Sequence, residues 1–397
     1  MPPYALLDNP VRHYPWGSPT AIPALTGTAP DGTPQAELWL GAHPSAPSRV
    51  DGRPLDDLIA ADPDALLGPE TVRRFGPTLP FLFKVLAADR ALSLQVHPTR
   101  AQAEAGYAEE QARGIPLDAP ERVFRDRSAK PELLVALGDF EALCGFRPTA
   151  GTARLLDSLG VLAPWAAALR GRPAEAVLPA LLRQALAAGA RQVADVAEAL
   201  RREAATGGRY AGSCAGYARL AEEHPGDPGL LAALLLNHVR LTAGQALYLD
   251  AGVPHAYLRG TGVELMANSD NVLRCGLTDK HVDVPGLLAV TTFRAAEPAV
   301  LSARPLNPVE AEFPTPAEEF RLSRLQLPTG AGRVELPTPQ ILLCVAGRAR
   351  LRAPGHPALD LPRGAAAYLR PGAGPVELTG PGAQLFRATT GRGAGTA

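Results

Sequence analysis

Four residues whose side chains are common metal ligands fall in three separate segments of this 397-residue chain. Gln95 and His97 alternate in the run SLQVHP, so on a β-strand both side chains lie on the same face. Glu132 begins the run ELLVAL, and His255 follows a Gly-Val-Pro turn. Two imidazoles with an amide oxygen and a carboxylate suit Zn2+ and would also accept Fe2+, Co2+ or Mn2+. Together the four residues predict a shared metal site.

Short apolar runs bounded by Pro, Gly or Asp must position three of these ligands. Residues 80–88, 91–96 and 132–137 have the composition of β-strands. Residues 97–114 are rich in Ala, Glu and Gln and begin with a His-Pro-Thr turn, which predicts a helix. We therefore expect residues 1–145 to be β-rich.

The character of the chain changes near residue 150. From there the apolar residues recur at helical spacing, so residues 148–238 are expected to form helices. From Val239 onward the chain returns to short Val, Leu and Tyr runs separated by Gly-Pro turns. An order of strands, helices and strands favours a helical insertion into a β architecture over an alternating βαβ fold.

Two stretches of the chain resemble one another. Residues 244–258, GQALYLDAGVPHAYL, can be aligned with residues 364–378, GAAAYLRPGAGPVEL, and two Gly, one Ala, the Tyr-Leu pair and the last Leu coincide. Two consecutive β-barrels of similar build would explain the match. Pro375 then stands where His255 stands, so only the first copy is expected to hold a metal.

The overall composition restricts the class of protein. The net charge is −1, with 39 basic and 40 acidic residues, so no global attraction to nucleic acid or an anionic membrane is expected. The N-terminus lacks a basic start followed by an apolar run, and the longest apolar stretches are too short to span a bilayer. The four cysteines are scattered without a CxxC pair, which favours a reducing compartment. These features predict a soluble, cytoplasmic protein.

Longer motifs carry a resemblance to a known family. The Gly-x5-Asp-x-Gly-x2-His pattern of residues 244–255 resembles the second motif of the cupin barrels, although Asp250 replaces the usual Pro and Arg259 the usual Asn. Residues 248–284 resemble the signature region of the type I mannose-6-phosphate isomerases, also called phosphomannose isomerases. So do HYPWGS, AELWLGAHPSAPS, LPFLFKVLAADRALSLQVHP and KPELLVAL, in the order of the family. The last hundred residues resemble it only in general character.

This resemblance implies a fold and a domain arrangement. The fold would be mainly β, with two cupin-like jelly-roll barrels and an α-helical domain. Residues 1–147 together with 239–295 would form the catalytic barrel, and residues 148–238 the helical insertion. Residues 296–397 would form a second barrel without a metal site.

The resemblance also implies an activity and a cofactor. One Zn2+ per chain would be held by Gln95, His97, Glu132 and His255, and the enzyme would interconvert mannose 6-phosphate and fructose 6-phosphate through a cis-enediol. The enediol develops negative charge on oxygen, which a fixed cation stabilises. Arg274, the active-site arginine by resemblance, is therefore our first catalytic candidate.

Other residues are assigned to the same pocket by resemblance. Lys130 and Asp270 are equal candidates for the proton carrier. The substrate-binding candidates are Trp16, Glu37, Lys84, Ser93, Glu264 and Lys280, of which Lys84, Ser93 and Lys280 would meet the phosphate.

Three alternatives to this activity remain at this point. The chain could be a metal-cupin that binds a sugar or sugar phosphate without turnover, or an isomerase of an unphosphorylated aldose. A cupin dioxygenase would prefer two histidines and one carboxylate, so Gln95 argues against it. A small sugar phosphate is the expected partner, and a monomer the expected state.

Overall fold

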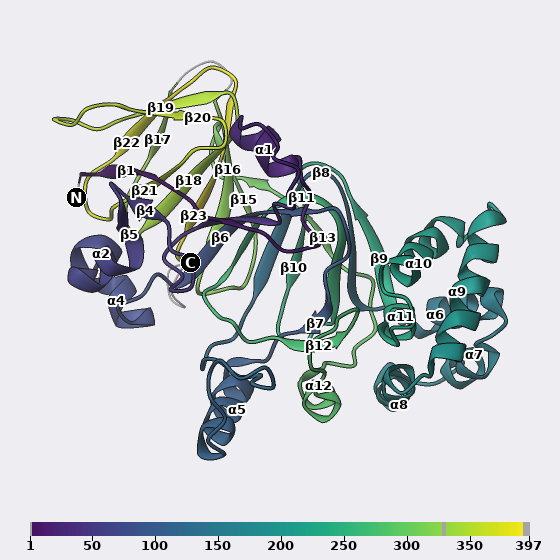
Figure 1. The fold of residues 1–397 in the computed structure, drawn as a ribbon. Coiled ribbons are helices and arrows are strands. Elements are labelled where there is room, and N and C mark those ends of the chain that lie inside the picture. Colours follow the sequence, from purple (N-terminus) through teal and green to yellow (C-terminus); the bar gives the residue numbers. More distant parts are fainter. Residues whose placement is uncertain (1, 328–330, 392–397) are drawn as a thin grey trace.

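The computed structural model describes residues 2–327 and 331–391. The fold is mainly β, with several sheets in the body of the molecule and a group of helices at one end (Figure 1). Among the described residues, hydrogen-bonded strand pairing closes none of these sheets into a barrel. None of the described helices is both long and apolar enough to cross a membrane.

The largest sheet has ten strands and carries the candidate metal ligands. Seven strands follow one another in the order β13-β10-β8-β11-β6-β3-β2, and β9, β7 and β12 are attached at its sides. The ten strands are β2 (Val11–Arg12), β3 (Glu37–Leu40), β6 (Phe81–Ala88), β7 (Leu94–Val96), β8 (Glu132–Phe146), β9 (Leu236–Leu241), β10 (Gln245–Leu249), β11 (His255–Ala267), β12 (Leu273–Gly276) and β13 (Val300–Ser302).

The smaller sheets are built mostly from the C-terminal part of the chain. A seven-stranded sheet contains β1 (Tyr4–Leu7), β14 (Arg304–Pro305), β15 (Glu310–Phe313), β16 (Arg321–Leu327), β18 (Gln340–Ala346), β21 (Ala366–Leu369) and β23 (Ala383–Thr389). A four-stranded sheet contains β17 (Ala331–Val334), β19 (Arg348–Arg352), β20 (Leu359–Pro362) and β22 (Val376–Thr379), and a two-stranded sheet β4 (Arg49–Val50) and β5 (Arg53–Pro54). Strand β1 pairs with β21, and β13 pairs with β10, so the two ends of the chain are interleaved.

Twelve helices lie around the sheets in the described part of the chain. Six of them, gathered on the side away from the C-terminal sheets (Figure 1), are α6 (Thr149–Leu159), α7 (Ala163–Leu169), α8 (Ala174–Leu186), α9 (Ala190–Ala205), α10 (Ala211–Glu223) and α11 (Gly229–Ala233). The others are α1 (Ala21–Thr26), α2 (Leu55–Ala61), α3 (Pro63–Leu67), α4 (Pro69–Phe75), α5 (Arg100–Ala112) and α12 (Val284–Val290).

The secondary structure expected around the ligands is confirmed. The runs 80–88 and 91–96 contain β6 and β7, and the helix expected in 97–114 is α5. A capping box between Thr99 and Gln102 begins this helix. The run 132–137 is only the first part of β8, which continues to Phe146. Helices α6–α11 lie within 148–238, although β9 already begins at Leu236.

The expectation of a β-rich segment over residues 1–145 missed four short helices, α1–α4, between β2 and β6. Two of these helices, α3 and α4, have local start signals in the sequence. Asp62 accepts a hydrogen bond from the amide of Ala65, and Pro63 and Pro69 occupy the first positions of α3 and α4. Proline is tolerated there because that amide has no partner within the helix.

Strand β6 shows how the large sheet separates apolar packing from charge. All eight of its residues are buried, so both faces of the sheet are covered. Phe81, Phe83 and Val85 join the core shared with the C-terminal sheet. Lys84 lies on the other face, and the strand register sets it beside Glu264 of β11.

The two similar stretches of sequence adopt the same local structure. In each, a strand is followed by a turn and a second strand: β10 and β11 in one copy, β21 and β22 in the other. Gly244 and Gly364 precede the first strand with φ of 85° and 82°, and Gly252 and Gly372 lie in the turn with φ of 78° and 71°. These left-handed conformations favour glycine, which explains why the glycines coincide in the alignment.

A charged cluster attaches the helices to the large sheet. Glu141 of β8 pairs with Arg219 of α10 and with Arg240 of β9. The imidazole of His238, with Nε2 3.7 Å from Glu141 Oε2, and the charge of Arg219 lower the pKa of Glu141 to about 2. These ion pairs therefore connect helix α10 to the sheet that carries the candidate ligands.

Candidate active site

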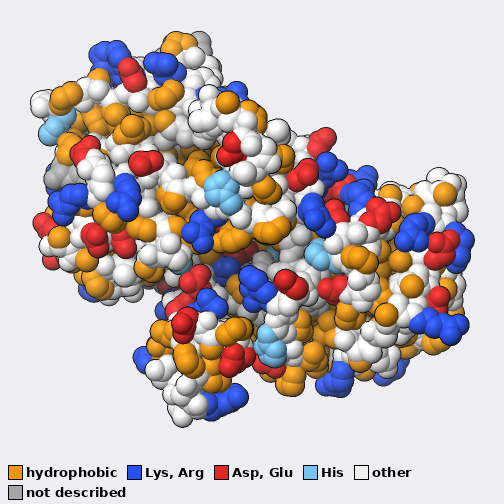
Figure 2. All heavy atoms as spheres, in the orientation of Figure 1, with side chains coloured by type: hydrophobic (Ala, Val, Ile, Leu, Met, Phe, Trp, Pro, Cys, Tyr) orange, Lys and Arg blue, Asp and Glu red, His pale blue; other side chains and the backbone are white. Residues whose placement is uncertain are grey.

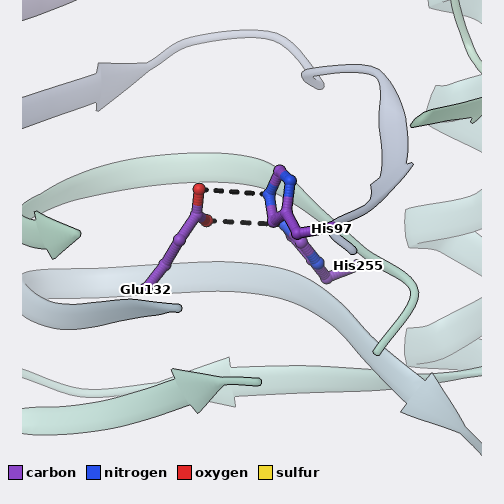
Figure 3. Close-up of side chains that lie close together, drawn as sticks. All are labelled: His97, Glu132 and His255. Carbon is purple, nitrogen blue, oxygen red and sulfur yellow. Dashed lines mark ion pairs between the residues drawn. The ribbon is translucent and has the colours of Figure 1, made fainter. Parts of the chain in front are cut away.

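Three buried side chains from three strand regions converge on one point. His97 follows β7, Glu132 begins β8 and His255 begins β11, and the carboxylate of Glu132 points toward both imidazoles (Figure 3). One ligand atom from each residue lies within 4.8 Å of the other two. Glu132 Oε1 is 3.1 Å from His97 Nε2, and Glu132 Oε2 is 3.5 Å from His255 Nε2. This cluster can hold one metal ion.

The hydrogen bonds around the cluster prepare it for a cation. His97 Nδ1 lies 2.8 Å from the carbonyl oxygen of Asn271, and His255 Nδ1 lies 2.9 Å from that of Val253. A carbonyl only accepts, so each Nδ1 donates its proton and each Nε2 carries a lone pair. His97 Nε2 and Glu132 Oε2 are buried without a hydrogen-bond partner among the described residues. A metal ion would satisfy these atoms, so the residues fit one.

Gln95 lies beside the three other candidate ligands. It is paired with His255 across β7 and β11, and its side-chain amide approaches His255 Nε2 to 3.4 Å. The two ends of this amide exchange by a half-turn about its last bond, so either can face the cluster. All four ligands expected from the sequence are therefore brought together.

Charge and burial set the protonation of the cluster. Burial, helped by the charge of Lys130, lowers the pKa of His97 to about 4, so its imidazole is neutral near pH 7. Burial opposes ionisation of Glu132, but the Lys130 ammonium 3.1 Å away holds its pKa well below the usual range. Neutral imidazoles and an ionised carboxylate are the forms that bind metals.

A second buried cluster lies on the same face of the sheet. The ammonium of Lys84 is 3.3 Å from Glu37 Oε1 and 3.5 Å from Glu264 Oε2. Trp39 donates its indole hydrogen to Glu37. Burial lowers the pKa of Lys84, but Glu37 and Glu264 outweigh it and raise the pKa above its usual value. Burial and the charge of Glu132 raise the pKa of Glu264 to about 7.

The catalytic candidates Asp270 and Arg274 lie near the metal cluster. Asp270 Oδ1 is 3.4 Å from His43 Nε2, and this contact lowers the pKa of the carboxyl. Arg274 of β12 is paired with Gln95 of β7 in the sheet. Burial and the charge of Arg125 lower the pKa of Arg274. Lys280 is exposed, and partial burial together with the charge of Arg274 lowers its pKa.

The remaining substrate-binding candidates are less closely placed. Trp16 stacks on Tyr14, with ring centroids 5.7 Å apart, and packs against the core that contains Tyr257. Ser93 is half-buried just before β7. Figure 2 shows acidic and basic side chains together in a hollow near the centre of the molecular face that it draws.

Among the site residues expected from the sequence, two sets are in direct contact. Lys130 is paired with Glu132, and Lys84 is paired with both Glu37 and Glu264 in a second cluster.

Sequence reasoning missed several residues around the cluster. His43 contacts Asp270, although the sequence analysis assigns it no role. The same holds for Arg125, Asp126 and Asn271, although Asn271 lies between the two catalytic candidates Asp270 and Arg274 in sequence. Two features of the sequence could have pointed to these residues: the position of Asn271 between the two candidates, and the Ala-His-Pro-Ser motif around His43.

Known proteins resemble this chain over nearly all of its length. A family model described as the catalytic domain of type I phosphomannose isomerase matches residues 5–149. Mannose-6-phosphate isomerase of Escherichia coli (strain K12) is 39% identical, over 95% of this chain and 97% of that protein. The Mus musculus mannose-6-phosphate isomerase is 31% identical, over 90% and 91%.

Solved structures of this kind superpose closely on the chain. A crystal structure of mannose 6-phosphate isomerase bound with zinc and yttrium has a TM-score of 0.89 and 37% identity, covering 98% of this chain and all of that one. The apo form from Salmonella typhimurium has a TM-score of 0.90 at 37% identity, with 99% and 100% covered. The resemblance carried by the sequence motifs is confirmed, and the chain belongs to the type I mannose-6-phosphate isomerase family.

Proposed function

We propose that this protein is a zinc-dependent isomerase that interconverts mannose 6-phosphate and fructose 6-phosphate. The buried cluster of His97, Glu132 and His255, with both imidazole lone pairs turned inward, is the observation that carries the proposal. Gln95 would be the fourth ligand. Zn2+ is the preferred ion because two imidazoles with oxygen ligands suit it, and because related structures contain zinc. When bound, it would supply a fixed positive charge beside the sugar oxygens.

The reaction moves one proton between neighbouring carbons. After ring opening, the C2 proton of the aldose leaves, the electrons of that bond form the C1–C2 double bond, and those of the C1–O1 double bond move to O1. This gives the cis-enediol in its enediolate form. The O2 hydroxyl proton then passes to O1, the C2–O2 double bond forms, and the electrons of the C1–C2 double bond take the proton back at C1, which gives the ketose. Negative charge develops on the oxygens in between, so fixed cations there lower the barrier.

The cationic residues near the cluster would have different roles in this reaction. Arg274, paired with Gln95 in the sheet, would stabilise the enediolate oxygens. Lys280 and Ser93 would meet the phosphate, whose charge favours a cationic pocket. Arg125 joins this group because its charge acts on both Arg274 and Lys280. Trp16, Glu37, Lys84 and Glu264 would shape the sugar pocket.

We assign the proton transfer to Lys130 in preference to Asp270. Lys130 is buried next to Glu132, whereas the Asp270 side chain is 52% exposed. As the neutral amine Lys130 would take the C2 proton, and as the ammonium it would return that proton to C1. The contact with His43 holds Asp270 in its charged form and so makes it a weak base. Asp270 would then orient His43 at the mouth of the pocket.

Turnover experiments test the proposed activity. Metal-loaded protein is expected to form ketose from mannose 6-phosphate, to lose this activity on chelation and to recover it with Zn2+. Mannose is expected to react poorly because it lacks the phosphate. Turnover of mannose alone would support the unphosphorylated-aldose alternative, and binding of either sugar without turnover would support a metal-cupin binding protein.

Two variants separate the proton-carrier candidates. Lys130→Met is expected to lower kcat by about 100- to 10,000-fold, the range typical of a lost general acid or base. It is also expected to abolish exchange of deuterium from D2O into the sugar. Asp270→Asn should keep the exchange and lose less of kcat. Exchange that survives in Lys130→Met but vanishes in Asp270→Asn would reverse the assignment.

The remaining parts of the proposal concern architecture and state. The large sheet would form the catalytic cupin-like barrel from residues 1–147 and 239–295, with residues 148–238 as a helical domain. Residues 296–397 would form a second jelly-roll barrel without a metal site, and the equal glycine conformations of the two similar stretches support the duplication. Strands β1 and β13 cross this boundary. The protein is proposed to act as a cytoplasmic monomer.

A further inference from the structure

Two segments that flank the metal cluster are joined through the buried side chain of Asn271. Its Oδ1 accepts hydrogen bonds from the backbone amides of Arg125 and Asp126, at 2.7 and 3.2 Å. Its Nδ2 donates to the backbone oxygens of Asp126 and Ser128, both at 2.9 Å. Both ends of this side-chain amide therefore bind the 125–128 segment, and neither faces the proposed substrate pocket.

The carboxylate of Asp126 makes the reverse connection. It accepts hydrogen bonds from the hydroxyl of Ser269 at 3.0 Å and from the backbone amide of Asp270 at 2.8 Å. It also accepts from Asn271 Nδ2 at 3.1 Å and from the amide of Ser128 at 2.8 Å. We call Asp126 and Asn271, with these reciprocal hydrogen bonds, the inter-segment clamp.

The clamp lies between the groups that the proposed reaction uses. The 125–128 segment leads directly into Lys130 and Glu132, and the 269–271 segment carries Asp270 and leads into Arg274. The backbone oxygen of Asn271 accepts the Nδ1 proton of His97. Asn271 thus orients the imidazole of His97 through its backbone oxygen and sets the spacing of the two segments through its side chain.

We propose that Asp126 and Asn271 are positioning residues, which hold Lys130 and Asp270 at fixed places relative to the metal ligand His97. This proposal rests on the proposed function for its effect on catalysis, but its effect on metal binding does not depend on it. Partners that orient a ligating imidazole contribute about 10- to 100-fold to metal affinity or activity. The clamp orients His97 and also sets the spacing of the segments. Its loss should therefore lower both the metal affinity and the activity.

The chain supplies a matched control for the main variant. Asn268 lies on the same segment, is half-buried and donates its side-chain amide to the oxygen of Leu79, away from residues 125–131. Asn268→Ala and Asn271→Ala therefore remove the same atoms from the same segment, and only the second opens the clamp. A purely structural role would lower the melting temperature in both and leave the metal site of the folded protein unchanged.

The test measures zinc affinity by chelator competition and kcat per bound zinc in the folded holoenzyme. Asn271→Ala is expected to weaken zinc binding about 10- to 100-fold and to lower kcat by a similar factor. KM for mannose 6-phosphate should change little, because the clamp does not face the substrate. Asn268→Ala should match the unaltered protein in zinc affinity, kcat and KM. Equal zinc affinity and kcat in the two variants would overturn the proposal.

A second variant covers the case in which Asn271→Ala does not fold. Asp126→Asn keeps the size of the side chain but replaces one acceptor oxygen by a donor facing the donors of the other segment. It should weaken zinc binding and lower kcat in the same direction, and unchanged values in this variant would also overturn the proposal. If the unaltered holoenzyme fails to isomerise mannose 6-phosphate, the proposed function fails, while the zinc affinities still decide whether the clamp positions His97.

Discussion

Replacing His255 with alanine is expected to release the bound metal ion and to reduce kcat/KM for mannose 6-phosphate by at least about 1,000-fold. The metal contributes several kcal/mol of charge stabilisation in reactions of this type, and each ~1.4 kcal/mol changes a rate tenfold. His255 begins β11, is fully buried and presents Nε2 to Glu132 at 3.5 Å. Its loss leaves three of the four protein ligands, His97, Glu132 and Gln95. Metal content after dialysis and turnover at saturating Zn2+ provide the two measurements.

The internal similarity of the chain supplies the control for this variant. Pro375 occupies the position of His255 in the second copy, after a turn with the same glycine conformation. Pro375→Ala should leave both metal content and kcat/KM unchanged. Metal retained at the original affinity in His255→Ala would remove His255 from the ligand set, and metal lost from Pro375→Ala would show that the second copy also contributes.

The metal ligands could be predicted from the sequence because strand geometry constrains them. Gln95 and His97 alternate on a short apolar run, so their side chains share a face wherever that strand lies. His255 follows a turn whose glycine needs a left-handed conformation, which the structure shows at Gly252. The helix α5 likewise begins with local capping chemistry between Thr99 and Gln102. These features depend on residues close together in the chain.

The contacts missed from the sequence depend instead on distant residues. His43 meets Asp270, and Asn271 meets Arg125, only after the sheet has brought their segments together. No local pattern encodes such pairs. Lys84 also depends on distant residues: its position between the two buried carboxylates of Glu37 and Glu264 follows from the strand register, whereas its expected contact with the phosphate rests on resemblance.

Replacing Lys84 with methionine is expected to destabilise the protein by about 3–5 kcal/mol, the usual cost of leaving buried charges without their partner. Lys84 is 7% exposed, and its ammonium is the counter-charge of both Glu37 and Glu264. Methionine keeps the apolar stem but removes the charge, so Glu37 and Glu264 must stay ionised without compensation or take up protons. The melting temperature should fall clearly, and adding Glu264→Gln to the variant should recover part of the loss because one buried charge is then removed.

The same experiment decides between two roles for Lys84, with Lys280 as the comparison. Lys280 is exposed near Arg274, so Lys280→Met should raise KM for mannose 6-phosphate at an unchanged melting temperature. If Lys84 instead serves chiefly to bind the phosphate, Lys84→Met should behave like Lys280→Met, with a raised KM and normal stability. We expect the opposite pattern, because an ammonium already paired with two carboxylates has little net charge to offer a phosphate. The buried lysine then belongs to the architecture of the pocket, and the exposed cations around Arg274 belong to substrate binding.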